Sequence, residues 1–180
     1  MATQAQHNYR IAKQKAVQRL GIRTHTALPS NVEVKNALIA YQSFYGGEHH
    51  LLQVNKMRKT AVRVMRLLEL FCPRLAEPVF EGTAGEHAPI TLHVFNDPPD
   101  TMAIHLLDNG VAFQNGQRKI RCHDGSDHQL ALLIIDVDGL EVELILFSRL
   151  DLRQAPPDPV DGRPQKRAPL AVVERLLTDI

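Results

Sequence analysis

Residues 130–147, LALLIIDVDGLEVELILF, decide the fold, because they read as two strands joined by a two-residue turn. The Asp138-Gly139 dipeptide between two apolar runs is a strong signal for a β-hairpin. The first run is almost continuously aliphatic, which is typical of a central strand buried on both faces. The second run alternates, so Glu141 and Glu143 share one side of the strand. The stretch therefore predicts the centre of a β-sheet with two carboxylates on one face.

Further strands and helices are expected around this hairpin. Ile90–Phe95 alternates polar and apolar residues and is predicted to be a strand. A short helix is predicted at 101–108, and a second hairpin at 111–122 around Asn115-Gly116. A proline-rich loop and a final helix, 169–178, complete the chain. This order predicts an α+β fold with a mixed or antiparallel sheet and a C-terminal helix.

The first 75 residues read as helices instead. Good helix formers fill Ala2–Leu20, and a second helix is expected after Ser30. Glu33 follows Ser30 at the spacing of a capping box. A third helix is predicted over residues 48–71, where apolar residues recur near helical spacing.

The two halves of the chain carry opposite charge, although the formal net charge is only +1. Residues 1–75 hold twelve Lys and Arg against three Asp and Glu, giving +9, whereas residues 76–180 carry −8. We therefore expect a basic helical region, 1–75, and an acidic α+β domain, 76–180. Either the basic region faces a phosphate-bearing partner, or it neutralises the acidic domain within or between chains.

The composition excludes several classes of protein. A hydrophobic content of 44% is too high for an intrinsically disordered chain, and two cysteines are too few for a disulfide scaffold. No apolar run approaches the ~18 to 20 residues needed to cross a bilayer, and the polar N-terminus lacks the apolar segment of a secretory signal. We therefore expect a soluble cytoplasmic protein without a membrane partner, and its oligomeric state stays open.

One glycine-bearing turn is a candidate for phosphate binding, although strong catalytic motifs such as GxxxxGK[ST], GxGxxG and HExxH are missing from the sequence. Gly82-Thr83 is expected to form a tight turn after a strand that ends at Phe80. A glycine there lets backbone N–H groups approach a phosphate, and the hydroxyl can add a contact. Arg163, in the proline-rich loop, can also contact the phosphate of a nucleotide, unless that loop is only a surface linker.

Acidic residues and a histidine suggest a metal site. His93 and Asp97 are four residues apart and share a face if the strand continues to residue 97, so they can hold a divalent metal. The alternative is a hydrogen-bonded strand histidine and a helix-capping aspartate. Asp97, Glu141 and Glu143 are candidate ligands for Mg²⁺, which binds few protein oxygens and completes its shell with water and substrate phosphate.

Segments 81–84, 90–95 and 140–145 together resemble the nucleotidyltransferase superfamily related to DNA polymerase beta, over about residues 76–150. That family places Gly-Ser or Gly-Gly after its first strand, an acidic pair on the next strand and a third acid on a later one. The layout is also similar to an uncharacterised bacterial family described as nucleotidyltransferase-like. The resemblance implies a nucleotide bound with Mg²⁺ and transfer of a nucleotidyl group.

The chain departs from the family at the acidic pair, because Thr91 and His93 stand where two carboxylates are expected. Gly82-Thr83 matches the Gly-Ser position conservatively, and Glu143 matches the third acid. Either the fold has lost catalysis and become a binding or partner module, or His93, Asp97 and Glu143 form an altered metal site and act as the catalytic residues.

A second functional hypothesis rests on the third predicted helix. Its cations are three, four and three residues apart, which places them along one helix face. Such a stripe can bind the phosphates of a nucleic acid without catalysis, or it can cover the acidic domain. The cations are Lys56, Lys59, Arg63 and Arg66.

Overall fold

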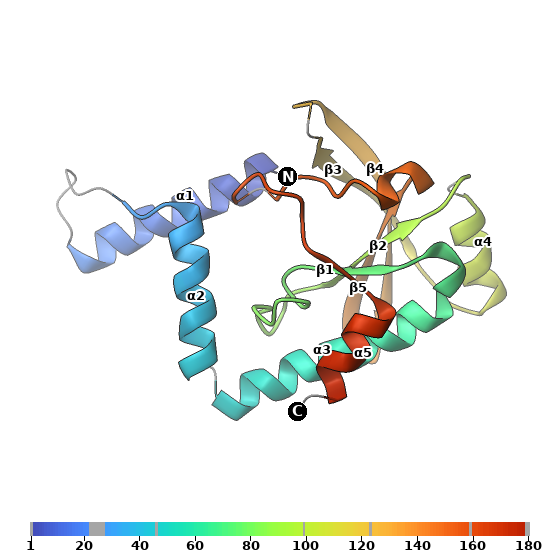
Figure 1. The fold of residues 1–180 in the computed structure, drawn as a ribbon, viewed down its shortest axis with the longest axis horizontal. Helices are drawn as coiled ribbons and strands as arrows, with labels where there is room; N and C mark the ends of the chain where they lie inside the picture. The colour runs from blue at the N-terminus through green and yellow to red at the C-terminus, as the bar shows by residue number, and fades with distance from the viewer. Residues whose placement is uncertain are drawn as a thin grey trace.

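The computed structural model describes residues 2–21, 28–45, 47–98, 100–122, 124–158 and 160–178. Within these ranges the chain forms five α-helices and one six-stranded mixed sheet, which confirms the expected α+β class (Figure 1). The helices are α1 (Ala2–Leu20), α2 (Asn31–Tyr45), α3 (Gly47–Leu67), α4 (Asp100–Asp108) and α5 (Leu170–Thr178). The strands are β1 (Arg74–Ala76), β2 (Ile90–Phe95), β3 (Gln114–Arg121), β4 (Asp127–Val137), β5 (Leu140–Phe147) and β6 (Arg167–Pro169). Two 3₁₀ turns are η1 (Glu69–Phe71) and η2 (Arg149–Leu152).

The strands lie in the order β3-β4-β5-β2-β1-β6. β2 and β5 are parallel, and every other neighbouring pair is antiparallel. The hairpin expected at Asp138-Gly139 is confirmed, and both residues have positive φ, as a two-residue turn of this kind requires. Its second strand is the one that pairs with β2, so Glu143 lies directly beside Thr91.

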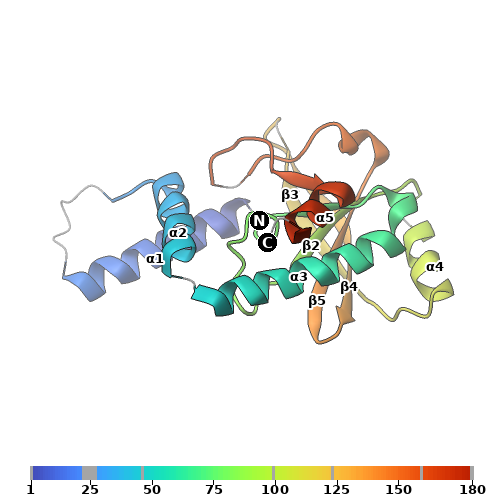
Figure 2. The same ribbon diagram turned by 60° about the horizontal axis from the view of Figure 1, so that its bottom comes forward.

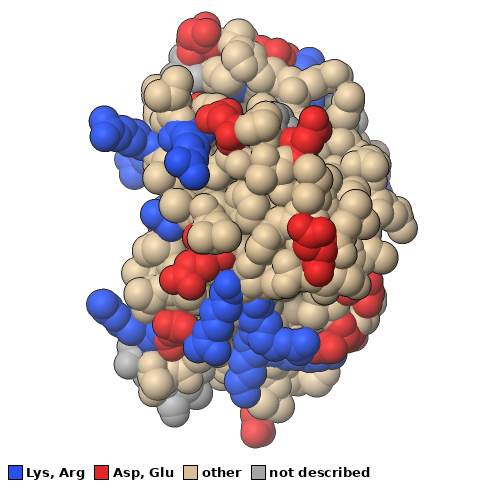
Figure 3. Space-filling view, turned by 90° about the vertical axis from the view of Figure 1, so that its right-hand side faces the viewer, with Lys and Arg blue, Asp and Glu red and all other residues tan. Residues whose placement is uncertain are grey.

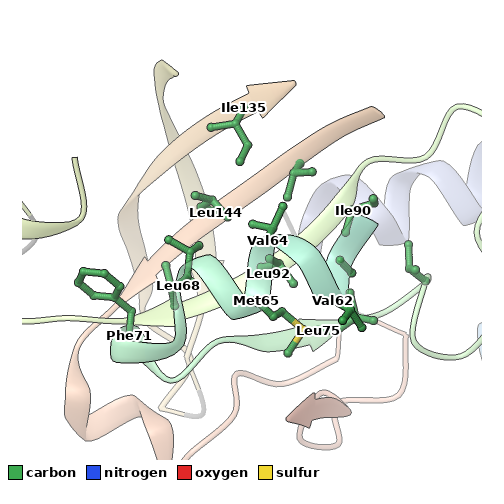
Figure 4. Close-up of a cluster of buried hydrophobic side chains, with 14 of the residues drawn as sticks. Val62, Val64, Met65, Leu68, Phe71, Leu75, Ile90, Leu92, Ile135 and Leu144 are labelled. Carbon is green, nitrogen blue, oxygen red and sulfur yellow. The ribbon is translucent and has the colours of Figure 1, made fainter. Parts of the chain in front are cut away.

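One face of the sheet is covered by α3 and α5, and α4 packs at its end (Figure 2). The apolar side of α3 is buried because its apolar residues recur at helical spacing and face the strands. Figure 4 shows this contact, in which side chains of α3 lie against those of β2 and β5; the labelled residues include Val64, Met65, Leu68, Leu92 and Leu144. The hydrophobic core therefore crosses the boundary expected at residue 75.

The opposite face of the sheet carries a smaller apolar cluster formed by Phe95, Leu132, Ile145 and Phe147. Leu152 of η2 packs against this cluster, so the chain that follows β5 covers part of the face. Charged side chains lie on the same face, because residues of one strand alternate between the two sides of a sheet. This second face contains the positions that the sequence singled out on β2 and β5.

The first two helices stand beside the sheet, as Figures 1 and 2 both show. The start of α2 has the expected capping box: the backbone N–H of Glu33 donates to Ser30 Oγ, and the N–H of Ser30 donates to the Glu33 carboxylate. α3 ends at Leu67, and the expected helix to residue 71 finishes as η1.

Two local predictions are wrong. The hairpin around Asn115-Gly116 does not form, because both residues lie inside β3, where Gly116 packs closely against Leu132 of β4. The chain turns later, where the N–H of Cys122 donates to the carbonyl of Ser126 and an αL glycine allows the reversal.

The strand expected to end at Phe80 ends at Ala76 instead. Pro78 cannot donate a hydrogen bond to a neighbouring strand. Its carbonyl accepts a hydrogen bond from the N–H of Thr83, which closes a compact loop.

Candidate functional site

His93 lies on β2 with only 2% of its surface exposed. Its ring centroid is 4.6 Å from that of Phe147 on β5. Burial, together with the nearby charge of Arg167, lowers the pKa of His93 to about 3. The imidazole is therefore neutral across the physiological pH range, and it is buried on the face of the sheet that α3 does not cover.

Glu143 lies beside Thr91, which stands where the resemblance predicts a carboxylate. Thr91 Oγ1 is 3.4 Å from Glu143 Oε2. The same carboxylate forms an ion pair with Arg118, whose side chain reaches over β4 from β3. Only 16% of the Arg118 side chain and 10% of the Glu143 side chain are exposed. The charge of Glu143 is thus already compensated by the protein.

The other candidate metal ligands do not converge on Glu143. Asp97 accepts a hydrogen bond from the backbone N–H of Arg149 at 3.0 Å, beyond the end of β2. The strand alone carries the chain about 13 Å from Thr91, which pairs with Glu143, to Phe95, and Asp97 lies beyond that end. Glu141 is exposed and lies opposite another acid of the β4–β5 hairpin.

These residues do not fit a Mg²⁺ site. In the parts of the chain that the structure describes, no group of three or more His, Cys, Asp or Glu residues is arranged to hold a metal. Glu143 is paired with Arg118, so its carboxylate does not offer the open positions that a metal ion needs.

The turn at Gly82-Thr83 uses its polar groups internally. The N–H of Thr83 donates to the carbonyl of Pro78 at 3.0 Å, and its Oγ1 lies 3.4 Å from the same oxygen. His50 Nε2 of α3 lies 2.9 Å from the Gly82 carbonyl. Arg58 donates to the carbonyls of Val79 and Phe80. The turn is therefore packed against the helices and does not face Glu143.

A cluster that the sequence did not reveal joins α2 to the body of the protein. Lys35 Nζ lies 2.5 Å from Glu77, 3.1 Å from Glu81 and 3.2 Å from Asp158. Lys166 lies 2.8 Å from Glu81 on the outer side. A cavity of about 260 Å³ adjoins these groups, and Arg163 is among the residues that line it. The structure thus places Arg163 beside the Lys35 cluster, apart from Glu143.

Burial sets the protonation of this cluster. Burial raises the pKa of Glu77 to about 7, although its hydrogen bond with Lys35 opposes that shift. Burial alone would also raise the pKa of Glu81, but hydrogen bonds from Lys166 and Lys35 outweigh it and lower the pKa. Glu77 is therefore the group whose charge changes near neutral pH.

Glu77 is expected to make stability depend on pH. Its pKa is higher in the folded chain than the ordinary 4.5, so the folded state binds more protons between these values. Its contribution to the free energy of unfolding is present below about pH 4.5 and is lost as the pH rises through about 7. Urea unfolding of wild type and Glu77→Gln, near pH 5 and near pH 8, should show the variant gaining relative stability at the higher pH. The exposed Glu86→Gln serves as control, and an equal pH profile for wild type and Glu77→Gln contradicts the assignment.

The cations of α3 lie on the side of the helix opposite its buried residues; we call Lys56, Lys59, Arg63 and Arg66 the α3 cationic face. Lys56 and Lys59 are exposed, and neither makes an ion pair with any residue the structure describes. Arg63 pairs with Asp138 of the β4–β5 turn, and Arg66 with Glu174 of α5 at 2.8 Å. On the face of the molecule drawn in Figure 3, Lys and Arg side chains lie next to Asp and Glu side chains. Two of the four cations thus pair with carboxylates of other elements, and the other two make no ion pair among the described residues.

Comparison with family models, curated proteins and solved structures found no match to this chain. Among the described residues, no helix is long and apolar enough to cross a membrane.

Proposed function

We propose that this protein is a non-catalytic nucleic-acid-binding module that contacts the phosphate backbone through the α3 cationic face. The observation that supports this most is the alignment of four cations on one side of a helix whose other side is anchored in the core. From Lys56 to Arg66 the helix rises about 15 Å, enough to follow several successive phosphates.

The two ion pairs on this face do not prevent phosphate binding. The side chains of Arg63 and Arg66 are 61% and 64% exposed. Exposed ion pairs contribute only about 0 to 1 kcal/mol, because water and salt screen them. A phosphate can therefore replace Asp138 or Glu174 at small cost, and Lys56 and Lys59 need not give up an ion pair within the described chain.

We still propose a nucleotidyltransferase-like fold, but transfer of a nucleotidyl group by this protein is less well supported than binding to a phosphate backbone. Glu143 is bound by Arg118, and His93 is buried and neutral. Neither group is arranged to bind a divalent metal or to move a proton to a reacting oxygen. A backbone-binding role requires neither.

The proposal predicts a strong salt dependence of nucleic-acid binding. If all four cations contact phosphates, the logarithm of the binding constant falls with a slope of about −3.6 per logarithm of salt concentration. Between about 50 and 200 mM salt, affinity should drop roughly 100-fold. Fluorescence anisotropy with a labelled DNA duplex measures this slope directly.

Replacing the four residues by glutamine should abolish most of the affinity and flatten the salt slope. A matched control replaces four exposed cations elsewhere by glutamine: Lys119, Arg121, Arg149 and Arg153. The control removes the same charge and should bind nearly as wild type does. Equal losses in the two variants, or unchanged affinity in the α3 variant, contradict the proposal.

A further inference from the structure

A second group of cations lies on the face of the sheet that α3 does not cover. Arg74 of β1 is directly opposite His93 of β2, and Arg167 of β6 is opposite Ala76 of β1. Residues two apart on one strand face the same side, so Arg74 and Arg167 are diagonal neighbours whose Cα atoms lie roughly 7–8 Å apart. The register thus brings two guanidinium groups and one imidazole to one place.

The two arginines are held by backbone carbonyls. Arg167 Nη2 donates to the carbonyls of Asp151 and Leu152 at 3.2 and 3.3 Å, and its guanidinium lies 5.2 Å from the centre of the Phe95 ring. Arg74 Nη1 donates to the carbonyls of Cys72 and Pro73. Within the described chain, neither arginine forms an ion pair with a carboxylate.

A carboxylate near Arg167 compensates its charge in part. Asp151 is the carboxylate that acts on Arg167, but its Oδ2 already accepts hydrogen bonds from the N–H and Oγ of Ser148, at 3.1 and 2.7 Å. Burial lowers the pKa of Arg167, and the charge of Arg74 lowers it further. Two cations on adjacent strands repel one another, and an anion bound between them would relieve that repulsion.

Two buried nitrogens in this place have no hydrogen-bond partner among the described residues. They are Nδ1 of His93 and Nη1 of Arg167. His93 is 98% buried, and a buried polar nitrogen without a partner costs free energy. Both nitrogens can donate a hydrogen bond, Nδ1 in one of the two neutral tautomers, so an oxyanion would satisfy them.

A cavity of about 280 Å³ with a mixed polar and apolar lining lies next to residues that contact the pair, although Arg74, Arg167 and His93 are not among the residues that line it. Its lining includes Phe147, which contacts the His93 ring, and Asp151, whose carbonyl holds Arg167. Ile120 and Leu130 add further apolar surface. This volume is close to the lower end for pockets that take small organic molecules. It gives a phosphorylated ligand a place for its organic part.

We propose that Arg74 and Arg167, with His93 beside them, bind the phosphoryl group of a small phosphate monoester whose organic part occupies the neighbouring cavity. Guanidinium forks match phosphate oxygens in pairs, and they supply the positive charge without a metal ion. The site is separate from the α3 cationic face, because the two lie on opposite sides of the sheet.

Isothermal titration with phenyl phosphate, inorganic phosphate and phenol tests this site. Phenyl phosphate should bind in a saturable manner and more tightly than inorganic phosphate, and phenol should not bind. Arg74→Gln should weaken binding by about tenfold or more, the equivalent of one charge-assisted hydrogen bond. Arg74 is partly exposed, so this variant should fold even if Arg167→Gln does not.

Two controls separate this proposal from the proposed nucleic-acid function. Arg149→Gln, on the exposed side of η2, should bind phenyl phosphate like wild type. The variant lacking the α3 cationic face should also bind it normally. Unchanged affinity in Arg74→Gln, or the absence of saturable binding to the wild type, overturns the site. Equal binding of inorganic phosphate and phenyl phosphate overturns the role of the cavity.

Discussion

Replacing Arg118 with methionine is expected to lower the free energy of unfolding by about 3 kcal/mol or more. The substitution leaves the carboxylate of Glu143 on the buried side of β5, and among the described residues it then keeps the Thr91 hydroxyl, at 3.4 Å, as its hydrogen-bond partner. A buried charge that loses its partner is strongly destabilising, because water no longer solvates it. Urea unfolding monitored by circular dichroism measures the loss.

The double variant Arg118→Met/Glu143→Gln identifies the cause of that loss. Neutralising Glu143 removes the uncompensated charge, so the double variant should recover much of the stability that Arg118→Met loses. A loss below about 1 kcal/mol in the single variant, with no recovery in the double, would mean that Glu143 is solvated. In that case Glu143 would be available as a metal ligand.

Met65→Ala is expected to destabilise the protein by about 2 to 5 kcal/mol. Met65 has no exposed surface and lies between α3 and the sheet (Figure 4). Truncation removes apolar contact and leaves a cavity that the surrounding strands fill only in part. The same unfolding measurement applies, and Leu51→Ala provides the control, because Leu51 of the same helix is 62% exposed.

This second prediction tests whether α3 belongs to the folded core of the sheet domain. The exposed control should change stability by about 0.5 kcal/mol or less. If Met65→Ala were equally mild, α3 would be a detachable element. Its cations would then lack the rigid support on which the proposed phosphate contacts depend.

Local sequence signals predicted much of the fold. The Asp138-Gly139 turn and the Ser30–Glu33 capping box depend on neighbouring residues, and both form as expected. Asn115-Gly116 carries the same kind of local signal, yet it lies inside β3. Long-range pairing with β4 overrode the local preference there, since eight residues of β3 gain partners by staying extended.

The candidate site was harder to predict, because its charges come from distant segments. The resemblance places Thr91 and Glu143 in one site, but the ion pair of Glu143 with Arg118 depends on the register of a third strand. Lys35 and Asp158 are 123 residues apart in the chain and meet only in the fold. No spacing in the sequence marks such a cluster, and the same holds for Arg74 and Arg167.

Nucleic-acid binding measured by anisotropy, first with EDTA and then with Mg²⁺, tests the central claim most directly. Cations on α3 bind phosphates without a metal, so affinity should be undiminished in EDTA, and Mg²⁺ should weaken it by competing for the phosphates. Binding that requires Mg²⁺ and disappears in EDTA would contradict the account, since it would show that carboxylates hold the ligand through a metal ion.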